Sequence, residues 1–156
     1  MQKKLNNKGF TIVEVLIVLA IAGVILATIL IAVPALQRNS RNTQVKQAAT
    51  ALVAGAQESA SANGGTAPTA ISAAGVWTPP TGGTPTTTKV GGSVTINSVA
   101  AGTAVTTTYV TNNVYVAFNE VCSGNTATSS GATAANIAVV YTVETGNGNS
   151  SGCIQA

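Results

Sequence analysis

The stretch Lys8-Gly9-Phe10-Thr11-Ile12-Val13-Glu14 decides the fold, because it joins a basic leader to a long apolar segment. A single carboxylate, Glu14, interrupts that segment near its start. A charged side chain at the centre of a membrane-spanning helix costs about 2.5–3.5 kcal/mol on insertion scales. A lone acid in such a place therefore predicts a partner of opposite charge.

The segment that follows, Val15 to Leu36, contains no charged side chain. As a helix it would be about 33 Å long, close to the ~30 Å hydrocarbon core of a bilayer. A removable secretory signal has its cleavage site after a shorter apolar region. The apolar run here is longer than that region. Hydropathy alone fits an uncleaved single-pass anchor equally well.

Three features, Gly9-Phe10-Thr11, Glu14 as the fifth residue counted from Phe10, and Gly23, resemble a type IV prepilin. The resemblance is specific from about Lys8 to Leu36 and covers the rest of the chain in outline. It implies that a prepilin peptidase cuts after Gly9 and N-methylates Phe10, which becomes the new N-terminus. It also implies that Glu14 neutralises the terminal amine of a neighbouring subunit. The alternative is that Glu14 lies at the headgroup level and faces water.

The positive net charge of +3 comes entirely from the leader, which contains Lys3, Lys4 and Lys8. From Phe10 onward four basic and four acidic side chains balance: Arg38, Arg41, Lys46 and Lys89 against Glu14, Glu58, Glu120 and Glu144. Lysines just before an apolar segment predict a cytoplasmic N-terminus, with the rest of the chain exported. Past Gly64 there is one basic residue, so strong binding of nucleic acid has no support.

The sequence predicts four regions: a cleaved leader (1–9), a hydrophobic transmembrane and assembly helix (10–36), an amphipathic continuation of that helix (37–63) and a globular β head (64–156). Val45, Ala49, Leu52 and Ala56 recur at helical spacing and predict one buried stripe. Asn63-Gly64-Gly65 predicts the end of the helix, because these residues tolerate the left-handed conformation.

Gly23 and Pro34 are the expected helix-breaking positions in the first half of the helix. Proline removes a helical hydrogen bond and clashes with the preceding turn, which predicts a kink or loosened stretch near Leu30 to Pro34. In the family that this chain resembles, some filaments lose helix between the glycine and the proline. Pro34 follows Gly23 at a longer interval than the family's usual one, so the place of any melted segment stays open.

The fold class expected is α+β, a pilin-like arrangement in which the second half of the helix packs on a roughly four-stranded antiparallel sheet. Strand signals occur at 93–97, 104–110, 114–118 and 137–143. In the third, Val114, Val116 and Phe118 share one face, with Tyr115 and Ala117 opposite. Residues 66–85, 123–125 and 129–131 are expected to form loops, and Asn112-Asn113 a hairpin turn.

Two cysteines, Cys122 and Cys153, agree with an oxidising exterior. A bond between them would contribute roughly 3–4 kcal/mol by restricting the unfolded chain. It would tie the loop after the third strand to the chain end. The resemblance implies such a C-terminal disulfide loop, and the alternative is a pair of unrelated buried thiols.

Catalysis is not expected, because the chain has no His and no Asp to serve as the usual base for a serine nucleophile. Glu120 and Glu144 are the only acids of the head, and nothing in the sequence places them together. Calcium requires several oxygen ligands, usually including carboxylates. We therefore expect no catalytic residue, no cofactor and no metal site, which argues against a calcium-binding pseudopilin.

The function expected from the resemblance is a structural subunit of a type IV pilus, serving adhesion, twitching motility or DNA uptake. Its partners would be further copies of itself in a helical polymer, the prepilin peptidase, the assembly machinery and, before assembly, the inner membrane. A host surface or DNA has no support. The protein would be a single-pass protein of the cytoplasmic membrane before assembly and extracellular afterwards. The alternatives are a minor pilin or type II secretion pseudopilin, and an uncleaved, membrane-anchored monomeric binding module.

Overall fold

The computed structural model describes residues 9–103, 105, 110–133 and 135–156. The lysines of the leader and most of the strand expected over 104–110 lie outside this part of the chain. The chain divides into two compact units, which we call the N-terminal unit (Met1–Gln37) and the C-terminal unit (Arg38–Ala156).

One long helix, α1 (Ile12–Ala62), accounts for all the helix of the described residues. Its end is as expected: Gly64 and Gly65 have φ of 67° and 84°, and the Gly65 nitrogen donates to the Ala60 oxygen at 2.8 Å. This is the left-handed termination that glycine permits. Its start is two residues later than the expected Phe10.

The helix runs through Gly23 and Pro34 without interruption. A Cβ added to Gly23 would meet no atom within 4 Å, so no packing requirement explains this glycine. The kink or loosened stretch expected near Leu30 to Pro34 does not appear as a break in the helix of the single chain. For the assembled filament it stays a prediction.

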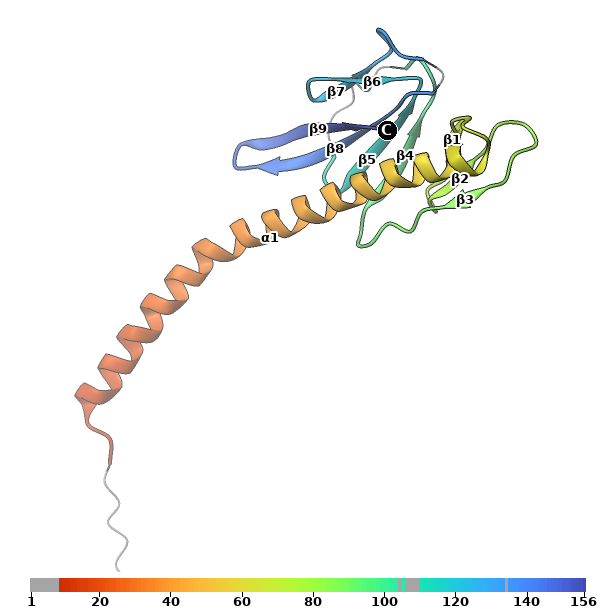
Figure 1. The fold of residues 1–156 in the computed structure, drawn as a ribbon. Helices are drawn as coiled ribbons and strands as arrows, with labels where there is room; N and C mark the ends of the chain where they lie inside the picture. The colour runs from red at the N-terminus through yellow and green to blue at the C-terminus, as the bar shows by residue number, and fades with distance from the viewer. Residues whose placement is uncertain (1–8, 104, 106–109, 134) are drawn as a thin grey trace, which may run out of the picture. The chain divides into compact units, whose positions relative to one another are not determined.

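The C-terminal unit contains a four-stranded sheet with the order β4 (Thr95–Val99), β5 (Asn113–Phe118), β8 (Ile137–Thr145) and β9 (Gly148–Gln155) (Figure 1). The number of strands is as expected, but β9 was not predicted from the sequence. The last three strands of the sheet are antiparallel, but β4 and β5 are parallel, so the sheet is mixed. The connection 100–112 is long enough for the crossover that parallel neighbours need. Asn112, at φ 62°, leads into β5 and does not join antiparallel neighbours.

Several strands were not expected from the sequence. The segment 66–85, expected to be a loop, contains β1 (Ala70–Ile71) and β2 (Val76–Thr78), which form a small three-stranded sheet with β3 (Thr86–Thr87). After β5, β6 (Val121–Ser123) and β7 (Thr126–Thr128) form a hairpin that was not expected, and the expected loop 123–125 falls at its turn. Of the expected strand 104–110, the described residues Val105 and Val110 are not in a strand.

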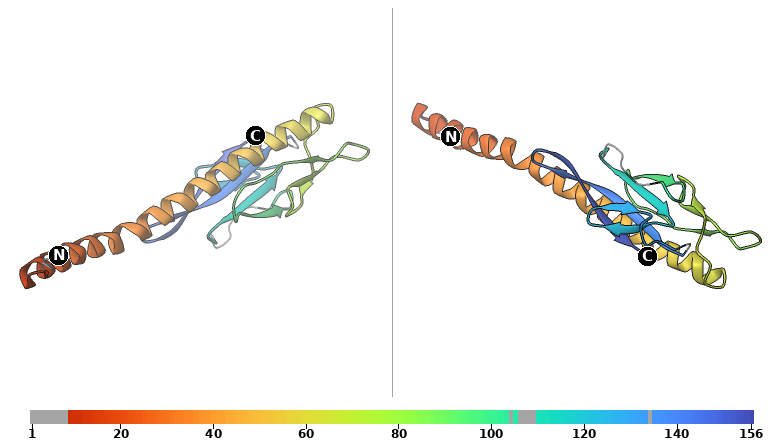
Figure 2. Two further views of the ribbon diagram at one scale, coloured as in Figure 1. Left: turned by 90° about the horizontal axis from the view of Figure 1, so that it is seen from below. Right: turned by 90° about the horizontal axis from the view of Figure 1, so that it is seen from above.

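Each face of the four-stranded sheet packs against a hydrophobic core, because apolar side chains of β5 point alternately to the two faces. Val114, Val116 and Phe118 belong to a helix-side core, whereas Tyr115 and Ala117 belong to a far-side core. The C-terminal part of α1 packs on the first of these faces (Figure 2). The predicted stripe is confirmed, because all four of its members are buried in the helix-side core: Val45, Ala49, Leu52 and Ala56.

The small three-stranded sheet reaches the helix at Gly55. Trp77 of β2 is fully buried, and its Nε1 donates to Thr88 Oγ1 at 2.8 Å. Its ring meets Phe118 edge-to-face, with the ring centroids 6.4 Å apart. A Cβ on Gly55 would lie in van der Waals overlap with the Thr88 hydroxyl. Glycine therefore permits this close approach of the sheet to the helix.

Candidate functional site

The start of α1 is held by a reciprocal contact between Thr11 and Glu14. The Glu14 nitrogen donates to Thr11 Oγ1 at 3.3 Å, and Glu14 Oε2 accepts from the Thr11 nitrogen at 3.4 Å and from Thr11 Oγ1 at 3.3 Å. This is a capping box, which satisfies amide groups that a helix N-terminus leaves free. An acid in the first turn also interacts favourably with the helix dipole.

The contribution of Thr11 was missed from the sequence, although a threonine followed three residues later by glutamate before an apolar run is the signature of this cap. The cap uses only one of the two carboxylate oxygens. Oε1 of Glu14 has no hydrogen bond within the part of the chain that the structure describes. Glu14 is therefore oriented toward the helix start, with one oxygen available to another group.

The surface around Glu14 is apolar. A shallow hollow of the helix surface is lined by Glu14 and by four apolar side chains: Phe10, Val15, Val18 and Leu19. Phe10 is 86% exposed, and no described cation forms an ion pair with Glu14. The arrangement thus offers a carboxylate oxygen beside an open apolar surface, where an electrostatic attraction is weakly screened once water is excluded.

The rest of the N-terminal unit continues this apolar surface. Every described residue of this unit, from Gly9 to Gln37, is exposed, including large aliphatic side chains such as Leu30 and Ile31. By length and composition α1 is able to cross a membrane. An exposed apolar surface of this extent marks contact with a membrane or with other protein chains.

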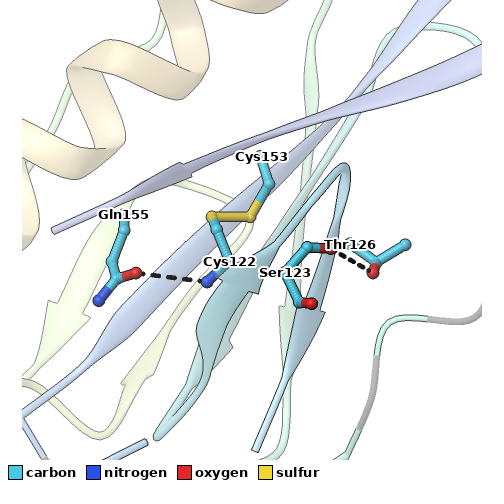
Figure 3. The surroundings of a disulfide bond; sticks show 5 residues. All are labelled: Cys122, Ser123, Thr126, Cys153 and Gln155. Atoms are coloured by element: carbon cyan, nitrogen blue, oxygen red, sulfur yellow. Dashed lines mark hydrogen bonds between the residues drawn. A yellow bond between two sulfur atoms is a disulfide. The ribbon is translucent and has the colours of Figure 1, made fainter. Parts of the chain in front are cut away.

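The two cysteines are bonded, with their Cα atoms 5.7 Å apart. Cys122 lies on β6 and Cys153 on β9, so the bond ties the β6–β7 hairpin to the last strand of the large sheet (Figure 3). The Cys122 nitrogen also donates to Gln155 Oε1 at 3.3 Å. Both cysteines pack against the far-side core, so the expected tie is present, with a short hairpin in place of a loop.

Glu144 forms an ion pair that the sequence did not reveal. Arg41 donates from Nε and Nη2 to its two oxygens, each at 2.6 Å. Asn42 adds two bonds to the same residue, because its Nδ2 donates to the Glu144 oxygen at 2.9 Å and its Oδ1 accepts from the Glu144 nitrogen at 2.7 Å. Hydrogen bonding from Arg41, aided by its charge, holds the pKa of Glu144 below the ordinary value, against an opposing effect of burial.

The surroundings of Glu120 differ from those of Glu144. Glu120 is fully buried, and among the described residues neither carboxylate oxygen has a hydrogen-bond partner. The structure does not join it to Glu144, whose partner is Arg41. Among the described residues no group of three or more His, Cys, Asp or Glu side chains could hold a metal ion.

Comparison with known proteins bears on the N-terminus alone. Residues 4–30 match a protein-family model described as the prokaryotic N-terminal methylation motif, which includes Gly9, Phe10 and Glu14. No curated protein and no solved structure matches the chain. The motif implies processing by a prepilin peptidase and points to a structural protein. The chain thus carries the signature of type IV prepilins, which supports a type IV pilin-like or pseudopilin-like precursor.

Proposed function

We propose that this protein is a subunit of a type IV pilus. The leader is cleaved after Gly9, Phe10 is N-methylated, and the mature chain polymerises through the apolar surface of residues 10–36. The observation that carries the proposal is the methylation motif at the start of an apolar helix whose described side chains, from residue 10 to 36, are all exposed.

The same helix serves as a membrane anchor before assembly and as a filament contact afterwards. In lipid, its aliphatic side chains gain little from contact with other copies, because lipid tails are equally apolar. Once the subunit leaves the bilayer, exposure of this surface to water costs about 25 cal/mol per Å². Further copies of the same helix are the natural cover for it.

Glu14 makes this association specific. Cleavage creates a positive amine on Phe10. The free oxygen Oε1 of Glu14 in a neighbouring chain is able to accept a hydrogen bond from this amine and form an ion pair with it. The apolar hollow beside Glu14 would exclude water from the pair, which strengthens the attraction and fixes the axial register of the two chains. The cap with Thr11 holds the carboxylate in place before the neighbour arrives.

The first test is the intact mass of filaments sheared from cells. A mass that begins at N-methylated Phe10, with two hydrogens fewer for the disulfide, is the expected result. A chain that begins at Met1, with no filaments, would instead identify an uncleaved, membrane-anchored monomer. The number of copies in the sheared material separates a major pilin from a minor pilin or a pseudopilin.

The second test replaces the charge of Glu14. The variant Glu14→Gln keeps the size of the side chain but removes its charge, so the protein should insert into the membrane and yield few filaments. Glu58→Gln is the matched control, because Glu58 is an exposed acid of the same helix outside the apolar segment. A normal filament yield from Glu14→Gln, measured by shearing and immunoblotting, would exclude the charge pairing.

A further inference from the structure

The chain contains two Asn-Gly pairs, Asn63-Gly64 and Asn147-Gly148. In such a pair the backbone nitrogen of glycine is able to attack the side-chain amide carbon of asparagine, because glycine has no Cβ to obstruct the approach and the backbone turns freely. The reaction needs a free asparagine amide and a backbone that can leave its resting conformation. In the structure, the two Asn-Gly pairs differ in both respects.

Asn63 is held by all of its polar side-chain atoms. Its Nδ2 donates to the Ser59 oxygen at 2.8 Å and to the Thr84 oxygen at 3.1 Å, and its Oδ1 accepts from the Thr84 nitrogen at 2.7 Å. The two bonds to Thr84 tie the end of α1 to the loop before β3. An attack by the Gly64 nitrogen would first require all three to break.

Asn147 has the opposite environment. It lies at the tip of the β8–β9 hairpin, between Thr145 and Gly148, which are the last paired residues of the two strands. It is exposed, and its side chain makes no hydrogen bond to any residue that the structure describes. Gly148 has φ of 134°, which other residues rarely adopt, and the terminal pair of a hairpin opens more readily than its centre.

From this contrast we propose that Asn147 is a site of spontaneous deamidation in the folded protein, and that Asn63 is protected. The Gly148 nitrogen forms a bond to Cγ of Asn147 and loses its proton, and the side-chain amide leaves as ammonia. Water then hydrolyses the resulting succinimide ring at one of its two carbonyls. The products are aspartate and isoaspartate, and no oxidant or reductant takes part.

The new carboxylate forms in a hairpin tip that a cation contacts. Nη1 of Arg38 donates to the Thr145 oxygen at 3.5 Å, and a Cβ on Gly146 would lie 3.9 Å from the same nitrogen. The modification therefore adds one negative charge to the hairpin tip that the Arg38 guanidinium contacts through Thr145. In the isoaspartate product the backbone gains one carbon, which alters the turn that closes β8 and β9.

The test follows both asparagines in the oxidised, full-length protein in detergent, incubated at mildly alkaline pH and sampled over days. No Lys or Arg follows Lys89, so trypsin gives no small peptide from this region. Cleavage at Glu144 followed by reduction releases residues 145–156, and tandem mass spectrometry distinguishes Asn147 from Asn149. We expect Asn147 to convert more than about tenfold faster than Asn63, since three hydrogen bonds protect the latter.

Two controls make the result specific to the fold. In the reduced, denatured chain, Asn63 and Asn147 should convert at similar rates, because the protecting bonds are lost. The variant Asn147→Gln should show no new acid at position 147. The proposal is overturned if folded protein converts Asn63 as fast as Asn147, or keeps Asn147 intact while the denatured chain loses both amides.

Discussion

Replacement of Gly55 by alanine has two opposing effects on stability, one from helix propensity and one from packing. In the interior of a helix, alanine is favoured over glycine by about 1 kcal/mol, because glycine loses more backbone freedom on folding. At Gly55, however, the added Cβ would overlap Thr88 Oγ1 and lie 2.9 Å from Thr88 Cβ and from Trp77 Nε1. The packing effect must therefore be compared with the propensity effect.

The packing effect should dominate, because the neighbours of Gly55 are themselves fixed. Trp77 has no exposed surface, and its indole nitrogen bonds Thr88 Oγ1. Overpacking of a filled core costs about 1–3 kcal/mol, and loss of the partner of a buried donor costs about 1–3 kcal/mol more. After subtraction of the helix gain, Gly55→Ala should lower the free energy of unfolding by about 1–5 kcal/mol.

Thermal unfolding of the full-length protein in detergent measures this effect, with the single tryptophan, Trp77, as a fluorescent reporter of the affected site. Gly23→Ala is the matched control in the same helix, because nothing lies within 4 Å of its added Cβ. Thr88→Ala combined with Gly55→Ala should recover part of the loss, since it removes the overlapping hydroxyl. A Gly55→Ala protein as stable as the parent would refute the packing argument.

Three further predictions concern the C-terminal unit. Replacement of both Cys122 and Cys153 by serine should lower the free energy of unfolding in urea by about 3–4 kcal/mol, and an unchanged midpoint would contradict this. Because the folded-state pKa of Glu144 is lowered, the stability that its pair with Arg41 contributes is present above the ordinary value of 4.5 and is lost as pH falls through the lowered pKa. The difference in Tm between the parent and Glu144→Gln should shrink over that interval, whereas a difference independent of pH would count against the pair. Glu120→Met should preserve stability or raise it by up to about 1–3 kcal/mol, because it removes two buried oxygens that have no partner among the described residues; a clear loss would indicate a partner for Glu120.

The helix was predictable because its signals are local. Val45, Ala49, Leu52 and Ala56 repeat with the helical period, and every one of them is buried in the helix-side core. Asn63-Gly64-Gly65 ends the helix by a conformation that few other residues adopt. The apolar character of residues 15–36 is likewise a property of the sequence itself.

The missed elements depend on contacts between distant residues. The sequence of β9 is rich in glycine, serine and asparagine, which are poor strand formers, yet all its residues pair with β8. Its strand conformation comes from that pairing and from the bond of Cys153 to Cys122. The parallel pairing of β4 with β5 joins strands that are not consecutive in a hairpin, and the pair of Arg41 with Glu144 joins residues 103 positions apart.

At the helix start, the sequence indicated the role of Glu14 but not the hydrogen bonds that Glu14 makes within its own chain. Thr11 uses Oε2 of Glu14 and leaves Oε1 without a partner in the described chain, so capping the helix and binding a second chain do not compete for the same atom. A carboxylate that is already oriented loses less side-chain freedom when a partner binds. If filaments assemble as we propose, the cap therefore prepares Glu14 for the incoming amine, and the interaction that starts the helix also lowers the cost of joining the next subunit.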